Sequence, residues 1–480
     1  MSERVIRIIS ETAVGKAENM RLIREKAGVY VYRCLFDGRP AVAKYYECEG
    51  DRREIGHYRR LREMGVPTIP LYAAGERCII MEDISASDTW RLGEDQDMDD
   101  PIVLRALAKW YFQLHEAGEK ADGLDEMYSE NAICPEDVRL MMKKLPRTEE
   151  LGRYVLERLG DFSRLIRARE NTLTYNDFYY TNLIVRRDRT QAMMFDYNLM
   201  GRGYRYADFR NIDSSVSTEA FGAFEEEYGR LYREKHGRAF MHPEEEARLD
   251  KFLSDFAGLM GALKRERFPG WAEEMKEAAE SGLLLRYAKG LMGDMRLIDE
   301  VRSYIPRCDQ EARDREEMLA RMERGENLLT RENTAAHWTA SAWVVSPDRR
   351  HVLMAYHNIY KSWAWLGGHA DGEEDLLSVA LREAKEESGI TSIRPLSGEM
   401  ISLEILPVAG HMKRGEYVSS HVHLNATYLF EADMDEPLTA KPDENSAVGW
   451  IRADELKDKV SEEWMKEWVY GKLMERAGEV

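Results

Sequence analysis

The sequence lacks the features that mark several common classes of protein. Its five cysteines are scattered without a C-x-x-C pair, so neither a cysteine zinc site nor a disulfide framework is indicated. Their odd number fits a reducing compartment, and we expect the protein to be cytoplasmic. No run of about 18 apolar residues is present, and the opening MSERVIRIISETAVG has no apolar signal core. We therefore predict neither a membrane span nor a secretory signal.

Basic residues are too few to balance the acidic ones. The chain has 69 Lys and Arg against 88 Asp and Glu, which gives a formal net charge of −19. Such a field disfavours nonspecific binding to nucleic acid or anionic membranes, and we expect neither as a partner. Hydrophobic residues still make up 44% of the 480 residues, enough for cores in two or three domains. The composition does not indicate an oligomeric state.

The pattern of residues divides the chain. In the first part strands alternate with one helix, and Asp37-Gly38 between two Val- and Tyr-rich runs is a hairpin signal. Helical spacing prevails in the middle, and strands return at Thr339. A charged stretch precedes that change and predicts a boundary. We expect domains at 1–305 and 336–480, with a helical linker or N-terminal extension at 306–335.

The stretch GGHADGEEDLLSVALREAKEESGI, residues 367–390, concentrates carboxylates on a predicted helix. An apolar face is formed by residues at three- and four-residue spacing: Leu377, Ala380, Leu381 and Ala384. Glu383, Glu386 and Glu387 are expected to share the opposite face. Like charges at this spacing cost stability unless they are neutralised, and hard oxygen ligands suit Mg²⁺ or Mn²⁺. The pattern is therefore that of a solvated acidic helix or of a metal site.

The same stretch resembles the Nudix box, G-x5-E-x7-R-E-U-x-E-E-x-G-U, in which U is apolar. Every fixed position is filled, by Gly368, Glu374, Arg382, Glu383, Ala384, Glu386, Glu387, Gly389 and Ile390. The flanking HWTASAWVV and KSWAWLGGH also resemble one branch of that family. The resemblance implies a Nudix α/β/α sandwich and metal-dependent hydrolysis of a nucleoside diphosphate derivative.

The resemblance also implies roles for single residues. Glu383, Glu386 and Glu387 are expected to hold the metal, Glu386 and Glu387 as part of the catalytic set. Arg382 is expected to orient the glutamates through ion pairs. Glu374 is a further ligand or a structural residue. Mg²⁺ or Mn²⁺ bound there polarises the phosphoryl oxygens and activates water.

Four aromatic or imidazole side chains near this stretch have two interpretations each. His421 and His423 alternate on a predicted strand, so both face one side. They contact substrate or act as a base, or they are hydrogen-bonded structural residues. Trp363 and Trp365 either pack in the core or stack on a base.

The N-terminal half carries charged residues of a different pattern. Asp177 and Asn182 are five residues apart in a loop between two apolar strands, LTYNDFYYTNLIV. Asp196 ends the next strand, and Lys44 lies within AVAKYY. A base, two Mg²⁺ ligands and a lysine for phosphates are the parts that phosphoryl transfer requires. Each of them alone is a common surface residue, so the argument depends on their order.

These residues resemble the motifs of the protein-kinase-like small-molecule phosphotransferases, the aminoglycoside phosphotransferase and choline/ethanolamine kinase group. The resemblance implies a bilobal kinase-like fold and ATP as cofactor. It implies that Asp177 is the catalytic base and that Asn182 and Asp196 bind Mg²⁺. Lys44, paired with Glu54, is expected to contact ATP, and Glu82 and Ile84 are expected to lie in the hinge that binds adenine. Asp208 is expected to brace the catalytic loop. Two departures are Tyr175 in place of the family's histidine and the absence of a G-x-G-x-x-G loop before Lys44.

Together these motifs predict an α+β multidomain enzyme, a kinase-like bilobal domain followed by a Nudix sandwich. Its expected substrates are a small-molecule hydroxyl acceptor and a nucleoside diphosphate derivative. Asn176 before Asp177 is nearer the choline kinase form, and nearby aromatic residues either receive an ammonium group or pack the lobe: Phe178, Tyr179, Tyr180, Tyr204 and Tyr206. Two alternatives are a pseudokinase that senses a nucleotide or binds a partner, and a Nudix half that only regulates the kinase.

Overall fold

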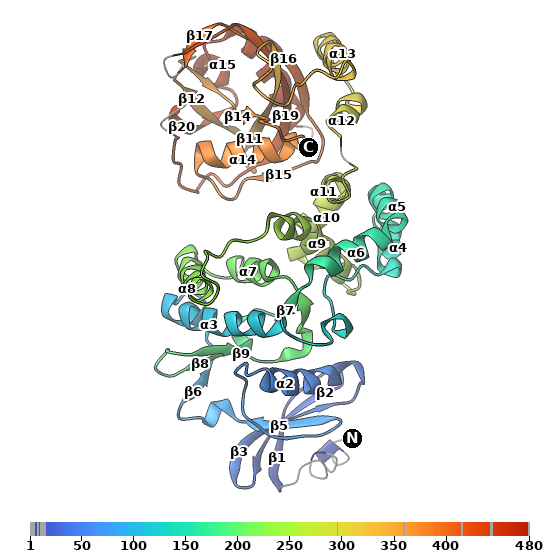
Figure 1. The fold of residues 1–480 in the computed structure, drawn as a ribbon, viewed down its shortest axis with the longest axis vertical. Coiled ribbons are helices and arrows are strands. Elements are labelled where there is room, and N and C mark those ends of the chain that lie inside the picture. The colour runs from blue at the N-terminus through green and yellow to red at the C-terminus, as the bar shows by residue number, and fades with distance from the viewer. Residues whose placement is uncertain are drawn as a thin grey trace. The chain divides into compact units, whose positions relative to one another are not determined.

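The computed structural model describes residues 5–6, 9, 16–294, 296–358, 361–413, 416–441 and 445–478 (Figure 1). The chain divides into two compact units. Unit 1 comprises Met1–Ile133 and Gly160–Ser254, and unit 2 comprises Cys134–Leu159 and Asp255–Val480. The predicted domain ends at 1 and 480 lie outside the described residues. Both units mix helices and sheets, as predicted.

Unit 1 begins with a five-stranded antiparallel sheet in the order β1-β2-β3-β5-β4. Its strands are β1 (Ala17–Lys26), β2 (Val29–Phe36), β3 (Arg39–Tyr46), β4 (Leu71–Ala74) and β5 (Cys78–Glu82). The predicted hairpin joins β2 to β3, where Phe36 pairs with Arg39. Asp37 and Gly38 both have positive φ, at 49° and 77°, as a two-residue hairpin turn requires. Helix α2 (Arg53–Glu63) follows β3 and ends before Gly65, whose φ is 75°.

The rest of unit 1 is mainly helical. Its helices are α3 (Pro101–Gly118), α7 (Arg205–Asp213) and α8 (Thr218–His236), with parts of α6 (Leu159–Arg169) and α9 (Glu244–Leu263). Short strands carry the loop expected to be catalytic: β6 (Trp90–Leu92), β7 (Thr172–Thr174), β8 (Leu183–Arg186), β9 (Ala192–Met194) and β10 (Gly201–Gly203). Asp100 caps α3 by accepting from the Ile102 amide at 2.9 Å, with Pro101 at the first turn. A sheet followed by a helical lobe is the predicted kinase-like arrangement.

Unit 2 contains an eight-stranded mixed sheet in which β11 (Ala336–Val345) and β19 (His421–Glu431) pair in parallel at the centre. The other strands are β12 (His351–His357), β13 (Ser362–Ala364), β14 (Leu366–His369), β15 (Arg394–Pro395), β16 (Ser402–Val408) and β20 (Asn445–Arg452). A separate hairpin joins β17 (His411–Lys413) and β18 (Glu416–Val418).

Helices cover both faces of this sheet. Helix α14 (Leu376–Ser388) shares a core with Trp338 and Ala340 of β11. Trp343 and Val345 on the other face pack with Tyr470 and the C-terminal helices. Those helices are α15 (Leu456–Lys459), α16 (Glu463–Met465), a π-helical turn (Lys466–Tyr470) and α17 (Gly471–Ala477). The predicted α/β/α sandwich is confirmed.

Further helices of unit 2 precede the sheet: α4 (Pro135–Lys144), α5 (Glu149–Glu157), α10 (Glu273–Glu280), α11 (Leu283–Leu291), α12 (Leu297–Ser303) and α13 (Asp309–Glu323). Arg286 of α11 is buried and holds three partners within unit 2. It contacts Glu300 at 2.5 Å, Asp375 at 2.8 Å and the carbonyl of Gly398 at 3.0 Å. Helices before residue 305 therefore pack with the sandwich, so the compact units do not divide at the predicted boundary, which stays a prediction for separately produced domains.

Helix α13, from the predicted linker, is anchored through Glu311. This carboxylate is fully buried and accepts from both terminal nitrogens of Arg476 in α17, at 2.6 and 3.0 Å. Lys472 adds a contact at 3.0 Å. Burial raises the pKa of Glu311, but the hydrogen bonds from Arg476 and the Arg307 amide, together with Lys472, outweigh it and lower that pKa to about 2. The segment is therefore an integral layer of the sandwich.

No helix among the described residues combines the length and the apolar character needed to cross a membrane. All five cysteines are free, and Cys34 and Cys78 are buried in unit 1.

We predict that Glu311→Gln destabilises unit 2 by about 3–5 kcal/mol, because one partner of a buried ion pair is removed. The folded pKa of Glu311 lies below its ordinary value of 4.5. Its contribution is therefore complete above pH about 4.5 and declines as the pH falls towards 2. Calorimetric unfolding from pH 7 to pH 3 measures both effects.

The matched control is Glu316→Gln, on the same helix but with a side chain that is 64% exposed. It is expected to change stability by less than about 0.5 kcal/mol. Equal stability of the two variants at pH 7 would contradict the anchoring role of Glu311.

Candidate active sites

In unit 1 the structure brings Lys44, Glu54 and Asp196 into contact. The Lys44 Nζ atom on β3 lies 2.6 Å from Glu54 Oε2 on α2 and 2.8 Å from Asp196 Oδ1 after β9. Burial lowers the pKa of Lys44, but the two carboxylates outweigh it and raise that pKa. The lysine is therefore a fixed cation beside two carboxylates, a group suited to phosphate oxygens.

Asp177 and Asn182 lie together in the loop between β7 and β8. The Asn182 side-chain amide donates to the carboxylate of Asp177 at 2.8 Å. Burial, and then the charge of Asp196, raise the pKa of Asp177. A carboxylate whose pKa is raised accepts a proton from an alcohol more readily than an ordinary aspartate does. The paired negative charges at Asp177 and Asp196 also suit a divalent cation.

Buried hydrogen bonds fix the position of this loop. Asp208 of α7 accepts from the backbone amides of Tyr175, at 3.1 Å, and Asn176, at 3.3 Å. It also contacts His115 at 3.1 Å. Asp208 therefore holds the loop, the position expected for it. His115 was not anticipated, because nothing in the helix sequence around it distinguishes it from any other core residue.

Tyr175 shows what replaces the histidine of the related motif. Its ring is fully buried, and its hydroxyl donates to the backbone carbonyl of Phe195. That carbonyl directly precedes Asp196, which has a left-handed backbone with φ of 63°. Tyr175 thus connects the loop of Asp177 to the residue before Asp196. The tyrosine that stands in place of the histidine therefore helps to hold the two carboxylates in their relative positions.

The residues expected at the adenine hinge have different environments. Glu82 ends β5 and is partly exposed, whereas the Ile84 side chain is 4% exposed and belongs to the core. The Ile84 carbonyl accepts from the amide of Ser87 at 3.2 Å. Any adenine contact at Ile84 would therefore use its backbone amide rather than its side chain or carbonyl.

Some of the aromatic residues considered for cation binding belong to the core, and others are exposed. Tyr204 is fully buried and donates to Asp250 at 2.9 Å, so its ring belongs to the core. Phe178 also packs against the core. Tyr179 is 53% exposed, and its ring lies 4.6 Å from that of Tyr180. Tyr206 is partly exposed, with its ring 5.1 Å from that of His242. Tyr179 and Tyr180 are therefore the candidates for an ammonium group that lie in the loop itself.

In unit 2 the acidic helix lies close under strand β14. A Cβ atom on Gly368 would lie 2.4 Å from Cδ of Glu383, so only glycine leaves that carboxylate in place. A Cβ atom on the neighbouring Gly367 would lie 2.4 Å from the carbonyl oxygen of Ala340 in β11. Gly389 ends α14 with φ of 75°, as its spacing predicts. Close packing therefore explains Gly367 and Gly368, and the left-handed backbone explains Gly389.

The three glutamates of the helix differ in their exposure to solvent. Glu387 is 5% exposed and accepts from the Gly367 amide at 3.0 Å and from Asn445 at 2.7 Å. Glu383 is partly buried, and Glu386 is exposed, 3.2 Å from Lys441. Because the helix lies close to β14, its three glutamates are buried to different degrees. The interpretation of the helix as a wholly solvated acidic face is therefore wrong.

Arg382 has the neighbours of an orienting residue, although its main partner was not anticipated. It contacts Glu373 at 2.8 Å and Glu383 at 3.5 Å. Glu374 is exposed in the turn before α14, so its role as ligand or structural residue stays a prediction. Sequence reasoning missed Glu373, Asn445 and Lys441. Of these three, only Glu373 could have been found from the sequence, because it is adjacent to Glu374 of the motif.

The remaining side chains singled out from the sequence also have defined positions. His421 and His423 face the same side, with their Nε2 atoms 3.1 Å apart, as their alternation predicts. Trp363 and Trp365 are partly buried and pack against the core of the sandwich, and the Trp365 ring lies 5.5 Å from that of Tyr470. These contacts favour packing, and the choice between packing and base stacking stays a prediction.

The family model of the NUDIX domain matches residues 335–471. This part of the chain is a NUDIX domain. The NUDIX domain indicates a hydrolase, so the chain is an enzyme. Among solved structures, a hydrolase of the NUDIX family from Clostridium perfringens is 23% identical over 30% of this chain and 96% of its own, with a TM-score of 0.21.

Other solved structures are similar to the kinase-like part. A macrolide 2′-phosphotransferase from Brachybacterium faecium is 16% identical over 60% of this chain and 98% of its own, with a TM-score of 0.36. A choline kinase from Cryptosporidium parvum Iowa II is 12% identical over 61% and 97%, with a TM-score of 0.38. No curated protein matches the chain. Because these scores are low, the kinase-like character of unit 1 depends on its own strand order and contacts.

The donor set of the NUDIX domain fits a divalent cation. Burial, and then the charge of Glu386, raise the pKa of Glu383, and a bound cation would oppose both effects. All of the candidate ligands are carboxylates, the ligands that Mg²⁺ and Mn²⁺ prefer. In unit 1, Asp196 offers a carboxylate oxygen and Asn182 an amide oxygen, which are also oxygen ligands of the kind that Mg²⁺ prefers.

We predict that Gly368→Ala lowers metal-dependent hydrolysis by at least about 100-fold while the fold is kept. The added methyl group displaces the carboxylate of Glu383 by about an ångström, and misplacements of that size cost about 100-fold. The measurement is kcat/KM on a nucleoside diphosphate derivative found by screening, with circular dichroism to verify folding.

Gly449→Ala in β20 is the control, because its Cβ atom would meet Trp363 at an ordinary 3.6 Å. It is expected to keep hydrolysis within a few-fold of the parent. Full activity of Gly368→Ala would mean that the position of Glu383 is unimportant.

Proposed function

We propose that the chain is a bifunctional cytoplasmic enzyme, an ATP-dependent small-molecule phosphotransferase fused to a metal-dependent NUDIX hydrolase. The observation that carries the proposal is the presence of a complete set of charged groups in each unit. Lys44, Asp177 and Asp196 supply one set, and Glu383 and Glu386 belong to the other. The alternative is a NUDIX hydrolase with a pseudokinase that senses a nucleotide.

In the phosphotransferase, Lys44 is proposed to contact the α- and β-phosphates, held in place by Glu54 at 2.6 Å. Asn182 and Asp196 are proposed as the Mg²⁺ ligands. Asp177 accepts the proton of the acceptor hydroxyl, and its raised pKa favours that step. Glu82 and Ile84 are proposed to border the adenine pocket.

In the hydrolase, Glu383, Glu386 and Glu387 are proposed to hold Mg²⁺ or Mn²⁺, with Glu374 as a further ligand. Metal bound there polarises phosphoryl oxygens and lowers the pKa of attacking water. The bonds of Glu387 to the Gly367 amide and to Asn445 fix its carboxylate before any ligand binds. Arg382 contacts both Glu373 and Glu383 and keeps the Glu383 carboxylate oriented.

We predict that the two activities separate by mutation. Asp177→Asn should lower phosphoryl transfer by about 100- to 10,000-fold, the range for loss of a general base, and leave hydrolysis unchanged. Glu386→Gln should do the reverse. Both activities are measured on the full chain, with a panel of hydroxyl acceptors and a panel of nucleoside diphosphate derivatives.

Asp188→Asn and Glu399→Gln, both in exposed turns, are the matched controls for loss of a carboxylate in each unit. Absence of any ATP-dependent transfer by the parent chain, with intact hydrolysis, would favour the pseudokinase alternative. Loss of both activities in folded Asp177→Asn would show that the sites are coupled.

We also predict that an amino alcohol is a better acceptor than a neutral sugar. Tyr179 and Tyr180 are partly exposed beside Asp177, and each cation–π contact contributes about 0.5–2 kcal/mol. Two contacts therefore favour the cationic acceptor by about 5- to 900-fold in kcat/KM. The comparison uses choline, ethanolamine, an aminoglycoside, a neutral sugar and a nucleoside under one condition.

Tyr179→Leu should reduce this preference, whereas the matched variant Tyr179→Phe keeps the ring and should retain it. A neutral sugar or nucleoside as the best acceptor would rule out the role of the tyrosines in selecting a cation.

A further inference from the structure

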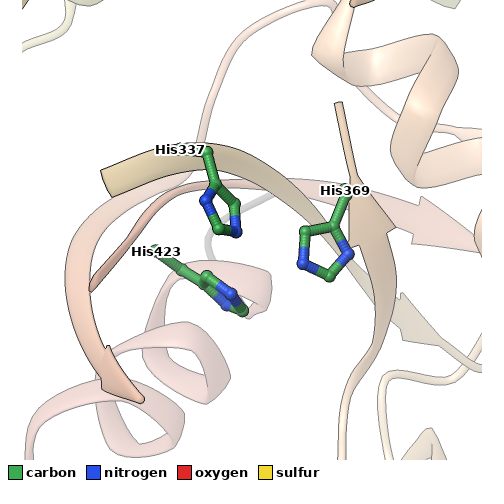
Figure 2. Close-up of side chains that lie close together, drawn as sticks. All are labelled: His337, His369 and His423. Carbon is green, nitrogen blue, oxygen red and sulfur yellow. The ribbon is translucent and has the colours of Figure 1, made fainter. Parts of the chain in front are cut away.

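Three histidines from three strands of the NUDIX domain meet on one face of its sheet. His337 lies on β11, His369 at the end of β14 and His423 on β19. The register explains the meeting, because His337 is aligned with His423, and His369 pairs with Thr339, two residues further along β11. Side chains two residues apart on a strand point to the same face. Figure 2 shows the three rings converging on one region.

This face is not the one that carries the NUDIX glutamates. Trp338 and Leu424, the neighbours of His337 and His423 along their strands, belong to the core shared with α14. Gly368, next to His369, faces Glu383 of that helix. Because adjacent residues of a strand alternate between faces, the histidines lie on the opposite side of the sheet. The triad is therefore separate from the glutamate site.

The hydrogen bonding of His337 leaves one nitrogen ready to act as a ligand. Its Nδ1 atom lies 3.0 Å from the carbonyl of Asn333, which only accepts, so Nδ1 carries the proton. Nε2 then holds a lone pair. The ring is 5% exposed, and no described residue hydrogen-bonds to Nε2. A backbone carbonyl that fixes the tautomer in this way is the usual support of a metal-binding histidine.

The spacing of the nitrogen atoms fits a single ion. One nitrogen from each of the three rings lies within 4.8 Å of the others, and the ring centroids are 5.0 to 5.2 Å apart. Three ligands at a zinc–nitrogen distance of about 2.0–2.1 Å are roughly 3.4 Å apart. Metal binding therefore requires the nitrogens to approach one another by at most about 1.4 Å, through rotation of the rings about their side-chain bonds.

We propose that His337, His369 and His423 bind one divalent transition-metal ion through their imidazole nitrogens, independently of the glutamates of α14. Imidazole favours ions such as Zn²⁺, Co²⁺ or Ni²⁺, whereas carboxylates favour Mg²⁺ or Mn²⁺. Three protein ligands leave a fourth position for water or another ligand. His421, whose Nε2 atom lies 3.1 Å from that of His423, borders the site and supports His423.

The competing interpretation is a cluster of histidines held together by ring contacts and hydrogen bonds. His337 and His421 are stacked with centroids 4.9 Å apart, which is compatible with packing alone. Packing does not, however, provide a partner for Nε2 of His337, and a buried polar atom without one costs about 1–3 kcal/mol. The metal accounts for that atom, and the two interpretations differ in a measurable way.

The test is a titration of the full chain, stripped with a chelator, with Co²⁺ in the presence of excess Mg²⁺. We expect one Co²⁺ per chain with the visible absorption of nitrogen-ligated tetrahedral cobalt, and displacement of the Co²⁺ by Zn²⁺. Loss of a ligand should weaken binding by at least about 100-fold, since even loss of a supporting residue costs 10- to 100-fold. His337→Gln, His369→Gln and His423→Gln are each measured, with thermal unfolding as a check of folding.

His351→Gln on β12 is the matched control, because His351 is a strand histidine outside the triad. Glu386→Gln tests independence from the glutamate site. The proposal is supported if both keep the cobalt spectrum while a folded triad variant loses it. It is overturned if the parent binds no Co²⁺ in this way, or if Glu386→Gln abolishes binding that the folded triad variants retain.

Discussion

Carboxylates held close together at partly buried positions are the constraint on which both candidate sites depend. Burial and a neighbouring negative charge raise the pKa of Asp177 beside Asp196 and of Glu383 beside Glu386. Such pairs store unfavourable energy that a divalent cation releases on binding. Glu311 shows the opposite solution, because Arg476 provides its counter-charge permanently. A carboxylate paired with a basic side chain stabilises the fold, whereas a carboxylate beside another carboxylate favours the binding of a cation.

The sequence predicted the features that local spacing controls. The Asp37-Gly38 turn, the apolar face of α14 and its end at Gly389 follow from φ preferences and helical periodicity, and all were confirmed. Strand β1 carried no such signal, because almost all of its residues are exposed and its apolar residues do not alternate. The burial of Glu387 was likewise hidden, since it depends on how close α14 lies to β14 and not on the helix alone.

The roles of contacts between distant residues were the hardest to predict. Tyr175 looked like a defect in a motif, yet its hydroxyl reaches the carbonyl of Phe195, twenty residues later in the chain. Helix α11 was assigned to the first domain, and α13 to a linker or to an N-terminal extension of the second. Arg286 and Glu311 bind both helices to the NUDIX sandwich. In each case long-range polar contacts decided the structural role, and sequence periodicity contains no information about such contacts.

The NUDIX sheet separates two kinds of metal-binding chemistry by strand alternation alone. Gly368 faces the glutamates of α14, and the next residue, His369, faces the other histidines. A one-residue shift in the pairing of β14 with β11 would exchange the two faces and destroy both groupings. Gly367 permits the observed register, because a Cβ atom there would lie 2.4 Å from the Ala340 carbonyl oxygen. Gly368 leaves room for Glu383 of the helix under β14, and Gly367 lets β14 pair with β11 in the register that brings the histidines together.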